Sequence, residues 1–238
     1  MSVEEDLWEK IACISVGPPG RVVENIVVEG CRKAELRLDL LAWDPREAAW
    51  AVEELSSRGV KVIVTLRDYR EGGRYRGDDS VKLKMLTELV EKGAWLADVE
   101  YRYPLLDEAL SSLEGKVMVS VHFTGWTPEA EVLYSYAGDM IRRGAVIAKI
   151  VGYASTLRDN WKLLGINVKW PGRVTSFAMG EAGRISRVVA PLIGGALTYV
   201  TLDKPSAPGQ LTLTELLQAW RLLGVMPSHA SSSGDEGS

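Results

Sequence analysis

The chain has 238 residues, of which 46% are hydrophobic and 25% are charged, and its formal net charge is −4. This length and composition are typical of a globular protein, and α/β barrels reach this size as one domain. The acidic balance lacks the basic footprint of a nucleic-acid binder. No apolar stretch approaches about 18 residues and the N-terminus is acidic, so we expect neither a membrane span nor a signal peptide.

The two cysteines, Cys13 and Cys31, lie near the N-terminus without the spacing of metal ligands. The chain has only two histidines, so a zinc motif cannot be assembled. We therefore expect both cysteines to be reduced thiols in a cytoplasmic protein. Asn and Gln are scarce, which is typical of heat-adapted proteins.

Eight short apolar runs recur along the chain, separated by segments that can each hold a helix. Most runs are rich in Val, Ile and Leu, as parallel strands buried on both faces should be. In chain order the runs are 11–16, 34–40, 61–67, 95–102, 116–123, 146–154, 173–179 and 196–202. Helix starts are predicted at Pro45 after Asp44, at Thr127-Pro128, and after Thr212 or Thr214.

This eightfold alternation predicts an α/β protein that folds as a single-domain (β/α)8 TIM barrel over residues 1–227. The alternative is a doubly wound open sheet, which usually has a glycine-rich turn after its first strand. Here residues 17–20 read Gly-Pro-Pro-Gly, and the prolines remove the N–H groups that a phosphate would need. Residues 228–238 have no apolar face, and we expect them to form a disordered tail.

Charged side chains share one face of several predicted strands, since residues two apart in a strand point the same way. Glu35, Arg37 and Asp39 share such a face, opposite leucines that we expect to meet the helices. The other sets are Thr65 with Arg67, Asp98 with Glu100 and Arg102, Ser120 with His122, and Lys149 on the same face as Ile147 and Val151. A buried ion-pair network is one interpretation. Because unpaired buried charges cost several kcal/mol each, polar sets on five adjacent strands favour a ligand or a reaction at the C-terminal end of a barrel.

Lys149 lies inside the apolar run 145–154. A buried ammonium is costly unless it is paired or loses its charge, and a neutral lysine attacks ketones and aldehydes. The alternative is a lysine on an edge strand, or one that reaches out to water. His122 belongs to the preceding strand at a comparable height. Together the two residues predict proton abstraction next to a carbonyl, with an imine on Lys149 and His122 as the base.

Three loops add candidate binding groups. Glu71 precedes two glycines that allow close backbone approach to a ligand, and it can orient a histidine. Residues 180–183 contain two glycines before a helix that carries Arg187, a candidate clamp for a carboxylate. Ser206 and Gln210 follow the last strand and can form hydrogen bonds with hydroxyl groups.

Eight segments, in order, resemble the type I 3-dehydroquinate dehydratases of the shikimate pathway over roughly residues 10–223. They are Glu-Leu-Arg-Leu-Asp at 35–39, Thr-Leu-Arg-Asp-Tyr-Arg-Glu-Gly-Gly at 65–73, Asp-Val-Glu at 98–100, Ser-Val-His at 120–122, Thr-Pro at 127–128, Ala-Lys-Ile at 148–150, Met-Gly-Glu-Ala-Gly-Arg-Ile-Ser-Arg at 179–187 and Ser-Ala-Pro-Gly-Gln at 206–210. The resemblance implies a lyase that dehydrates 3-dehydroquinate to 3-dehydroshikimate by syn elimination, on the route to chorismate and aromatic amino acids.

The resemblance also implies roles for nine residues. Lys149 would form the imine, His122 would move the proton, and Glu71 would tune the histidine. The implied substrate contacts are Glu35, Arg37 and Arg67 to ring hydroxyls, and Arg187, Ser206 and Gln210 to the carboxylate. No metal or organic cofactor is implied, and the expected partners are the small-molecule substrate and a second copy of the chain.

Two segments depart from the family pattern. Phe123-Thr124 stands where the family often has Asp-Phe after its histidine, and Ile193-Gly194-Gly195 replaces a Phe-Gly-Ser segment. One competing hypothesis is a class I aldolase, in which Arg187 and the glycine turns would bind a phosphate. Another is a catalytically inactive barrel that binds a polyol acid, although both Lys149 and His122 are present.

Overall fold

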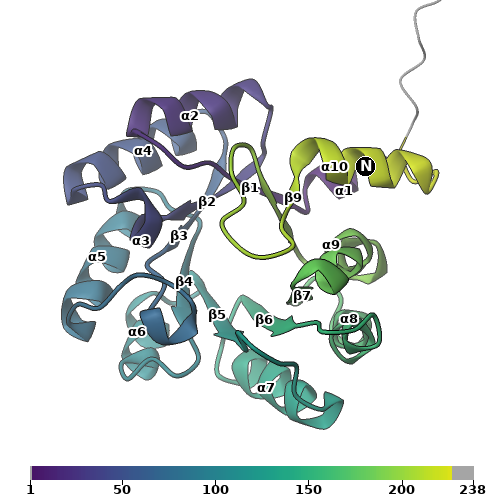
Figure 1. Cartoon of the computed structure of the whole chain (residues 1–238). Coiled ribbons are helices and arrows are strands. Elements are labelled where there is room, and N and C mark those ends of the chain that lie inside the picture. The colour runs from purple at the N-terminus through teal and green to yellow at the C-terminus, as the bar shows by residue number, and fades with distance from the viewer. Residues whose placement is uncertain (1, 227–238) are drawn as a thin grey trace, which may run out of the picture.

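The computed structural model describes residues 2–226 of the chain, and the predicted disordered tail at 228–238 lies outside them. Strands and helices alternate in a closed ring (Figure 1). The strands are β1 (Ile11–Ile14), β2 (Lys33–Arg37), β3 (Lys61–Thr65), β4 (Leu96–Glu100), β5 (Val117–His122), β6 (Ile147–Tyr153), β7 (Val174–Met179), β8 (Thr198–Thr201) and β9 (Leu211–Thr212). The α-helices are α1 (Val3–Trp8), α2 (Pro19–Val28), α3 (Leu38–Leu41), α4 (Pro45–Ser57), α5 (Asp79–Glu91), α6 (Leu106–Ser112), α7 (Ala130–Arg142), α8 (Asp159–Lys169), α9 (Arg184–Val189) and α10 (Leu213–Leu222). Short 3-10 helices are η1 (Tyr69–Glu71), η2 (Glu181–Gly183) and η3 (Ala190–Ile193).

The strands form one parallel sheet that curls into a barrel. Its order is β7-β6-β5-β4-β3-β2-β1-β8-β9, so β1 lies between β2 and β8. Hydrogen bonds from Ala196 N–H to the Val174 carbonyl (2.7 Å) and from Leu197 N–H to the Thr175 hydroxyl (2.9 Å) close the ring between β8 and β7. The predicted TIM barrel is confirmed, and a doubly wound open sheet is excluded.

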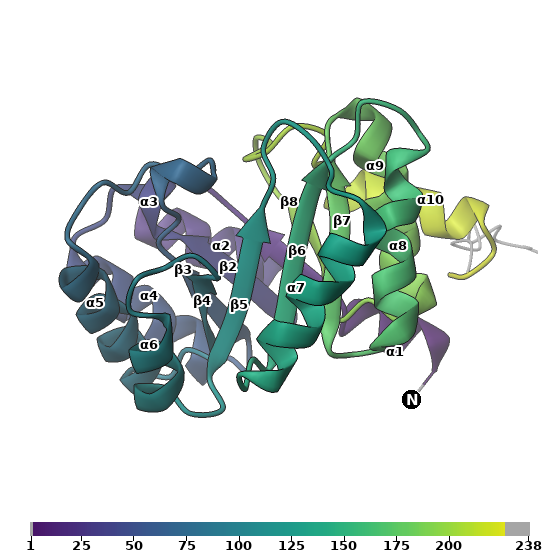
Figure 2. The same cartoon turned by 90° about the horizontal axis from the view of Figure 1, so that it is seen from below.

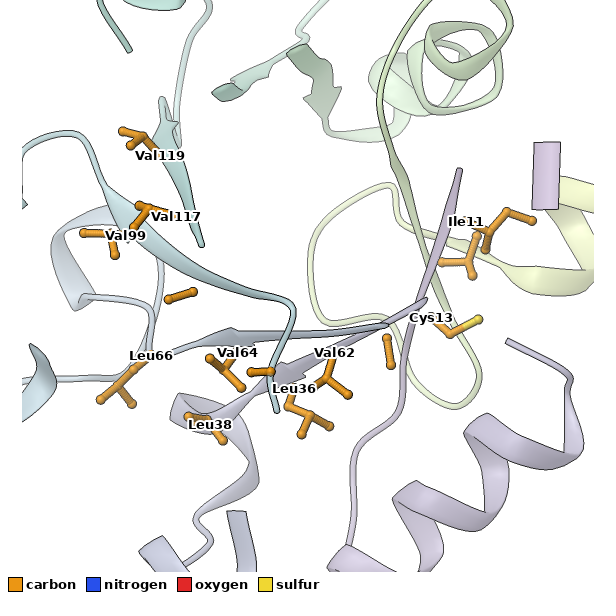
Figure 3. Close-up of a cluster of buried hydrophobic side chains, with 14 of the residues drawn as sticks. Ile11, Cys13, Leu36, Leu38, Val62, Val64, Leu66, Val99, Val117 and Val119 are labelled. Carbon is orange, nitrogen blue, oxygen red and sulfur yellow. The ribbon is translucent and has the colours of Figure 1, made fainter. Parts of the chain in front are cut away.

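Each strand has an inner and an outer face, as alternation requires. The outer face packs against the helices and belongs to the larger hydrophobic cluster; Figure 3 shows its members Leu36, Val62, Val64 and Val119. The inner face forms a smaller cluster inside the barrel that includes Ile63 and Met118. The helices cover the barrel with apolar faces such as Leu83, Leu86 and Leu89 of α5. Among residues 2–226, no helix is both long and apolar enough to cross a membrane.

Helix starts follow the expected capping chemistry at two of three places. Asp44 caps α4, and Thr212 caps α10 in a reciprocal pair with Glu215. The expected start at Thr127 is wrong, because α7 begins at Ala130 and the Thr127 hydroxyl instead donates to the Tyr153 carbonyl of β6.

The expected second strand is too long at its C-terminal end. β2 ends at Arg37, and Leu38–Leu41 form the single helical turn α3, which ends at Ala42 with a left-handed φ of 53°. Leu38 and Leu41 are both buried, and their i, i+3 spacing suits a helical turn. Alternating leucines predict a strand, but Leu38 and Leu41 also fit the longer period of a helix.

Cys13 and Cys31 form a disulfide, so the expectation of reduced thiols is wrong. β1 and β2 are paired in parallel, with Cys13 opposite Ala34, and Cys31 lies just before β2. This pairing brings the two Cα atoms to 6.2 Å, within the range of natural disulfides. Both side chains are buried in the cluster between the barrel and the helices. The predicted barrel makes these two strands neighbours, but the sequence alone could not indicate the register that brings the two cysteines together.

Candidate active site

A cavity of about 240 Å³ opens at the carboxyl ends of the strands. In Figure 2, the arrowheads of β5 and β6 point toward this end, where α3 and the loop between β8 and β9 lie. The cavity is lined by all nine predicted site residues: Glu35, Arg37, Arg67, Glu71, His122, Lys149, Arg187, Ser206 and Gln210. The structure therefore brings together residues from β2 to the last loop, as a barrel site requires.

Lys149 is buried on β6, which lies between β5 and β7 and is not an edge strand. Its Nζ lies 3.0 Å from Asp98 Oδ2 and 3.1 Å from Glu35 Oε1. The ring of Tyr199 lies beside it, with its centroid 4.1 Å from Nζ. Two carboxylates and an aromatic face compensate the buried ammonium. The alternative of a lysine that reaches water is excluded, because only 4% of the residue is exposed.

Asp98 connects Lys149 to the other cation on the cavity floor. Its Oδ2 also lies 2.7 Å from Arg67 Nη2, and Ser120 bridges the two residues with its hydroxyl group. Burial alone would oppose ionisation, but Arg67 and Lys149 hold the pKa of Asp98 well below its usual range. Asp98 therefore remains a carboxylate that keeps the Lys149 amine pointed into the cavity.

His122 ends β5, one strand from Lys149, and is held by Glu71. Glu71 Oε2 accepts the His122 backbone N–H at 2.9 Å and lies 3.1 Å from Nδ1. Burial, with the charges of Arg67 and Lys149, lowers the pKa of His122 well below its usual value. The imidazole is therefore neutral at physiological pH. With Nδ1 facing Glu71, Nε2 is the nitrogen left to accept a proton.

Glu71 is itself an unusual carboxyl group. Burial raises its pKa from 4.5 to about 7, with Glu100 adding to the rise and Arg67 opposing it. Its second oxygen, Oε1, is buried without a hydrogen-bond partner among the described residues. Perturbed carboxyl groups of this kind are typical of functional sites.

Arg187 is a buried cation that forms no ion pair with any residue from 2 to 226. It is 2% exposed, its Nε has no hydrogen-bond partner, and its guanidinium lies 4.5 Å from the ring centroid of Phe177. Burial, with a contribution from Arg184, lowers its pKa to about 10, so the group stays charged at neutral pH. A charge held in this way suits an anionic group that enters the cavity.

The other predicted contacts are Arg37, Ser206 and Gln210, which also line the cavity. Arg37 forms a two-pronged pair with Asp39, both distances being 2.9 Å. In the loop between β8 and β9, the Ser206 N–H and hydroxyl both donate to Gln210 Oε1. This loop is tied to the end of β7 by a hydrogen bond from the Gly180 N–H to the Pro208 carbonyl.

Sequence reasoning assigned no role to two residues that contact Lys149. Asp98 was part of the polar set on β4 and of the Asp-Val-Glu segment that resembles the family, and these two signals could have found it. Tyr199 lies on β8 in an otherwise unremarkable apolar run, so only the closed barrel reveals its position. Of the two departures from the family pattern, Thr124 lines the cavity, whereas Ile193 does not. Among residues 2–226, no group of three or more His, Cys, Asp or Glu is placed to hold a metal ion.

Comparisons with known proteins identify relatives of this chain. A family model described as type I 3-dehydroquinase matches residues 19–227. A 3-dehydroquinate dehydratase from Dehalococcoides mccartyi is 34% identical over 198 residues, which cover 81% of this chain and 86% of that protein.

Two solved structures share the fold. The 3-dehydroquinate dehydratase from Geobacillus kaustophilus has a TM-score of 0.81 at 23% identity, covering 92% of this chain and 93% of its own. The type I 3-dehydroquinate dehydratase from Clostridium difficile, solved with covalently modified comenic acid, has a TM-score of 0.77 at 25% identity and covers 90% of this chain and 92% of its own.

Proposed function

Because the chain belongs to the type I 3-dehydroquinase family, we propose that it dehydrates 3-dehydroquinate to 3-dehydroshikimate through an imine on Lys149. The observation that carries this proposal is the placement of Lys149 and His122 in one cavity on adjacent strands, with Ser120 opposite Lys149 and His122 opposite Val151 in the sheet register. The covalently modified ligand in the Clostridium difficile relative supports covalent chemistry.

The reaction begins when the Lys149 amine attacks the ketone carbon and the resulting carbinolamine loses water to form an imine. Lys149 must first give up a proton and leave its ion pairs. Asp98 and Glu35, which lie at 3.0 and 3.1 Å, stabilise the protonated imine that replaces the ammonium. The protonated imine then acts as an electron sink for the carbanion formed beside it.

His122 removes the proton next to the imine carbon, and the electrons form an enamine. The enamine pushes out the hydroxyl group on the next ring carbon, which leaves as water with the proton from His122. Since one imidazole serves both positions, proton and hydroxyl leave from the same face, which is syn elimination. Hydrolysis of the imine releases the product and restores Lys149.

The cavity also offers groups that would hold the substrate. We assign the substrate carboxylate to Arg187, because this cation is buried without an ion-pair partner among residues 2–226. Ser206 and Gln210 lie in the same lining and would assist it. Glu35 would accept hydrogen bonds from the ring hydroxyls, and Arg37 and Arg67 would donate hydrogen bonds to them.

Trapping with borohydride tests substrate, chemistry and residue together. Wild-type protein treated with 3-dehydroquinate and borohydride should gain a stable adduct on Lys149, and dehydration should raise ultraviolet absorbance as the enone forms. Lys149→Met should abolish both, whereas the surface variant Lys84→Met should retain both. An adduct on another residue would remove the central step, and a cleavage product without an enone would favour an aldolase.

The cellular setting and assembly belong to the same proposal. We place the enzyme in the cytoplasm as a homodimer. The disulfide is buried from reductants, with Cys13 and Cys31 only 0% and 4% exposed, and intracellular disulfides are common in hyperthermophiles.

Exposed Leu157 and Trp161 offer an apolar surface for a second copy. Light scattering at micromolar concentration measures the assembly, and a monomer would contradict this part.

A further inference from the structure

The most deeply buried lysine outside the substrate cavity, among residues 2–226, is Lys82. Lys82 projects from α5 toward the barrel and is 1% exposed, whereas its neighbours on that face are leucines. Its Nζ contacts Glu100 Oε2 and lies 5.0 Å from the ring centroid of Tyr103. Lysine is rarely buried so completely, and when it is, its charge is paired. The proposed reaction does not use this charge directly.

Glu100 connects Lys82 to the site. While one oxygen of Glu100 contacts Lys82, the other accepts the Asp68 backbone N–H at 2.9 Å and lies 3.2 Å from Arg67 Nη1. The Glu100 carboxylate therefore contacts Lys82 of α5, Arg67 in the cavity, and the backbone of Asp68, the first residue of the loop that carries Glu71.

The loop from Asp68 to Gly73 is too compact to absorb a displacement at its start. The Gly73 N–H donates to the Asp68 carbonyl, and a Cβ atom on Gly73 would lie 2.0 Å from the Arg67 carbonyl oxygen. Glu71 lies in the middle of this loop and contacts His122. A shift of Asp68 or Arg67 should therefore reach the proton-transfer pair.

The field at Glu71 is set by a small group of charges. A second cavity of about 130 Å³ lies beside it, lined by Asp68, Arg70, Glu71, Glu100, Arg102 and Tyr103. The groups that face Glu71 are Arg67 from the end of β3, Glu100 from β4, Arg102 beyond β4, His122 from β5, and the Asp68–Arg70 pair of its own loop. Arg102 Nη1 lies 3.6 Å from the otherwise unpartnered Oε1.

We propose that Lys82 and Glu100 are positioning residues, which fix the loop of Glu71 and the electrostatic field at Glu71 and thereby hold His122 ready as the base. This inference rests on the proposed function. Neither residue lines the substrate cavity. Lys82 balances the charge of Glu100; without that balance, Glu100 would oppose the ionisation of Glu71 and draw Arg67 toward itself.

The proposal predicts opposite effects for two variants. Lys82→Met leaves the charge of Glu100 uncompensated, so Glu71 should hold its proton to higher pH. Glu100→Gln removes a negative charge near Glu71, so Glu71 should lose its proton at lower pH. At an effective dielectric constant near 20, the gain or loss of one charge near Glu71 shifts the pH midpoint of the Glu71 titration by about half a unit or more.

The His122 ring reports this titration by NMR in the substrate-free protein. The sequence has only one other histidine, His229, so His229→Ala completes the assignment. The pH midpoint seen at His122 should rise in Lys82→Met and fall in Glu100→Gln. Lys82→Arg, which keeps the charge, should resemble wild type, and so should the matched control Lys84→Met on the exposed face of α5.

Enzyme assays provide the second readout. The acid limb of kcat should move to higher pH in Lys82→Met and to lower pH in Glu100→Gln. Unchanged midpoints in the folded Glu100→Gln protein would overturn the proposal by themselves, as would shifts of the same sign in both variants. If wild-type protein instead failed to dehydrate 3-dehydroquinate, the proposed function would be wrong. The substrate-free titration would still test whether Lys82 and Glu100 set the field at Glu71.

Discussion

Replacing Arg187 with methionine should stabilise the protein and weaken substrate binding at the same time. Arg187 is buried on α9 and forms no ion pair with any other residue of the described range 2–226. Burial is the main reason that its pKa falls from 12.5 to about 10. A difference of this size corresponds to a cost of about 3 kcal/mol for holding the cation in the folded state.

The sign of this effect follows from proton linkage. The folded protein binds the Arg187 proton less tightly than the unfolded chain, so the full cost is present below pH 10 and disappears only as pH rises above it. Methionine fills a similar volume without the charge. We expect the free energy of unfolding at pH 7.5 to rise by about 1–3 kcal/mol, and Tm by roughly 2–12 °C.

Binding should change in the opposite direction. Removing one partner of a buried charge pair costs about 2–5 kcal/mol, so the dissociation constant for substrate should rise roughly 30- to 5000-fold. Denaturant unfolding and steady-state kinetics measure the two effects. Arg184→Met on the same helix is the matched control. The exposed pair of Arg184 with Glu215 (2.8 Å) contributes only about 0–1 kcal/mol to the free energy of unfolding.

Either of two results would refute this reasoning. A destabilised Arg187→Met protein would mean that the guanidinium serves the fold and is not an unpaired charge held for a ligand. An unchanged KM would mean that another group binds the substrate carboxylate.

Two other predictions concern the base and the disulfide. His122→Ala should still form the borohydride-trapped adduct on Lys149 but lose about 10²- to 10⁴-fold in kcat, since general base catalysis contributes that much; near-normal turnover would exclude it as the base. Replacing Cys13 and Cys31 with alanine should lower the free energy of unfolding by roughly 3 kcal/mol, from closure of a loop with a sequence separation of 18. Thiol titration of the unfolded, unreduced wild type should find no free thiol, and two free thiols would contradict the bridge.

The fold could be predicted because its signal repeats. Eight apolar runs with helices between them leave few architectures that bury every run on both faces. Strand ends were less certain, as Leu38–Leu41 show: four residues rich in leucine satisfy a strand period and a helical turn equally well. The turn was decided by packing of Leu38 and Leu41 and by the left-handed backbone at Ala42.

Part of the cavity could also be predicted, because alternation along a strand fixes which side chains share a face. That argument placed Glu35, Lys149 and His122 inside a barrel before any contact was known. It could not pair them. Lys149 contacts Glu35 at a sequence separation of 114 and Asp98 at a separation of 51.

By itself, the sequence determined the repeated period, the inward-facing set and the chemical groups available for a reaction. These depend on residue type and on spacings of a few residues, and both can be read directly from the sequence. Only the tertiary structure decided which groups are neutralised and which are not. It paired Lys149 with two carboxylates, left Arg187 without one among the described residues, and joined Cys13 to Cys31, because strand register and barrel closure set the distances between residues far apart in the chain.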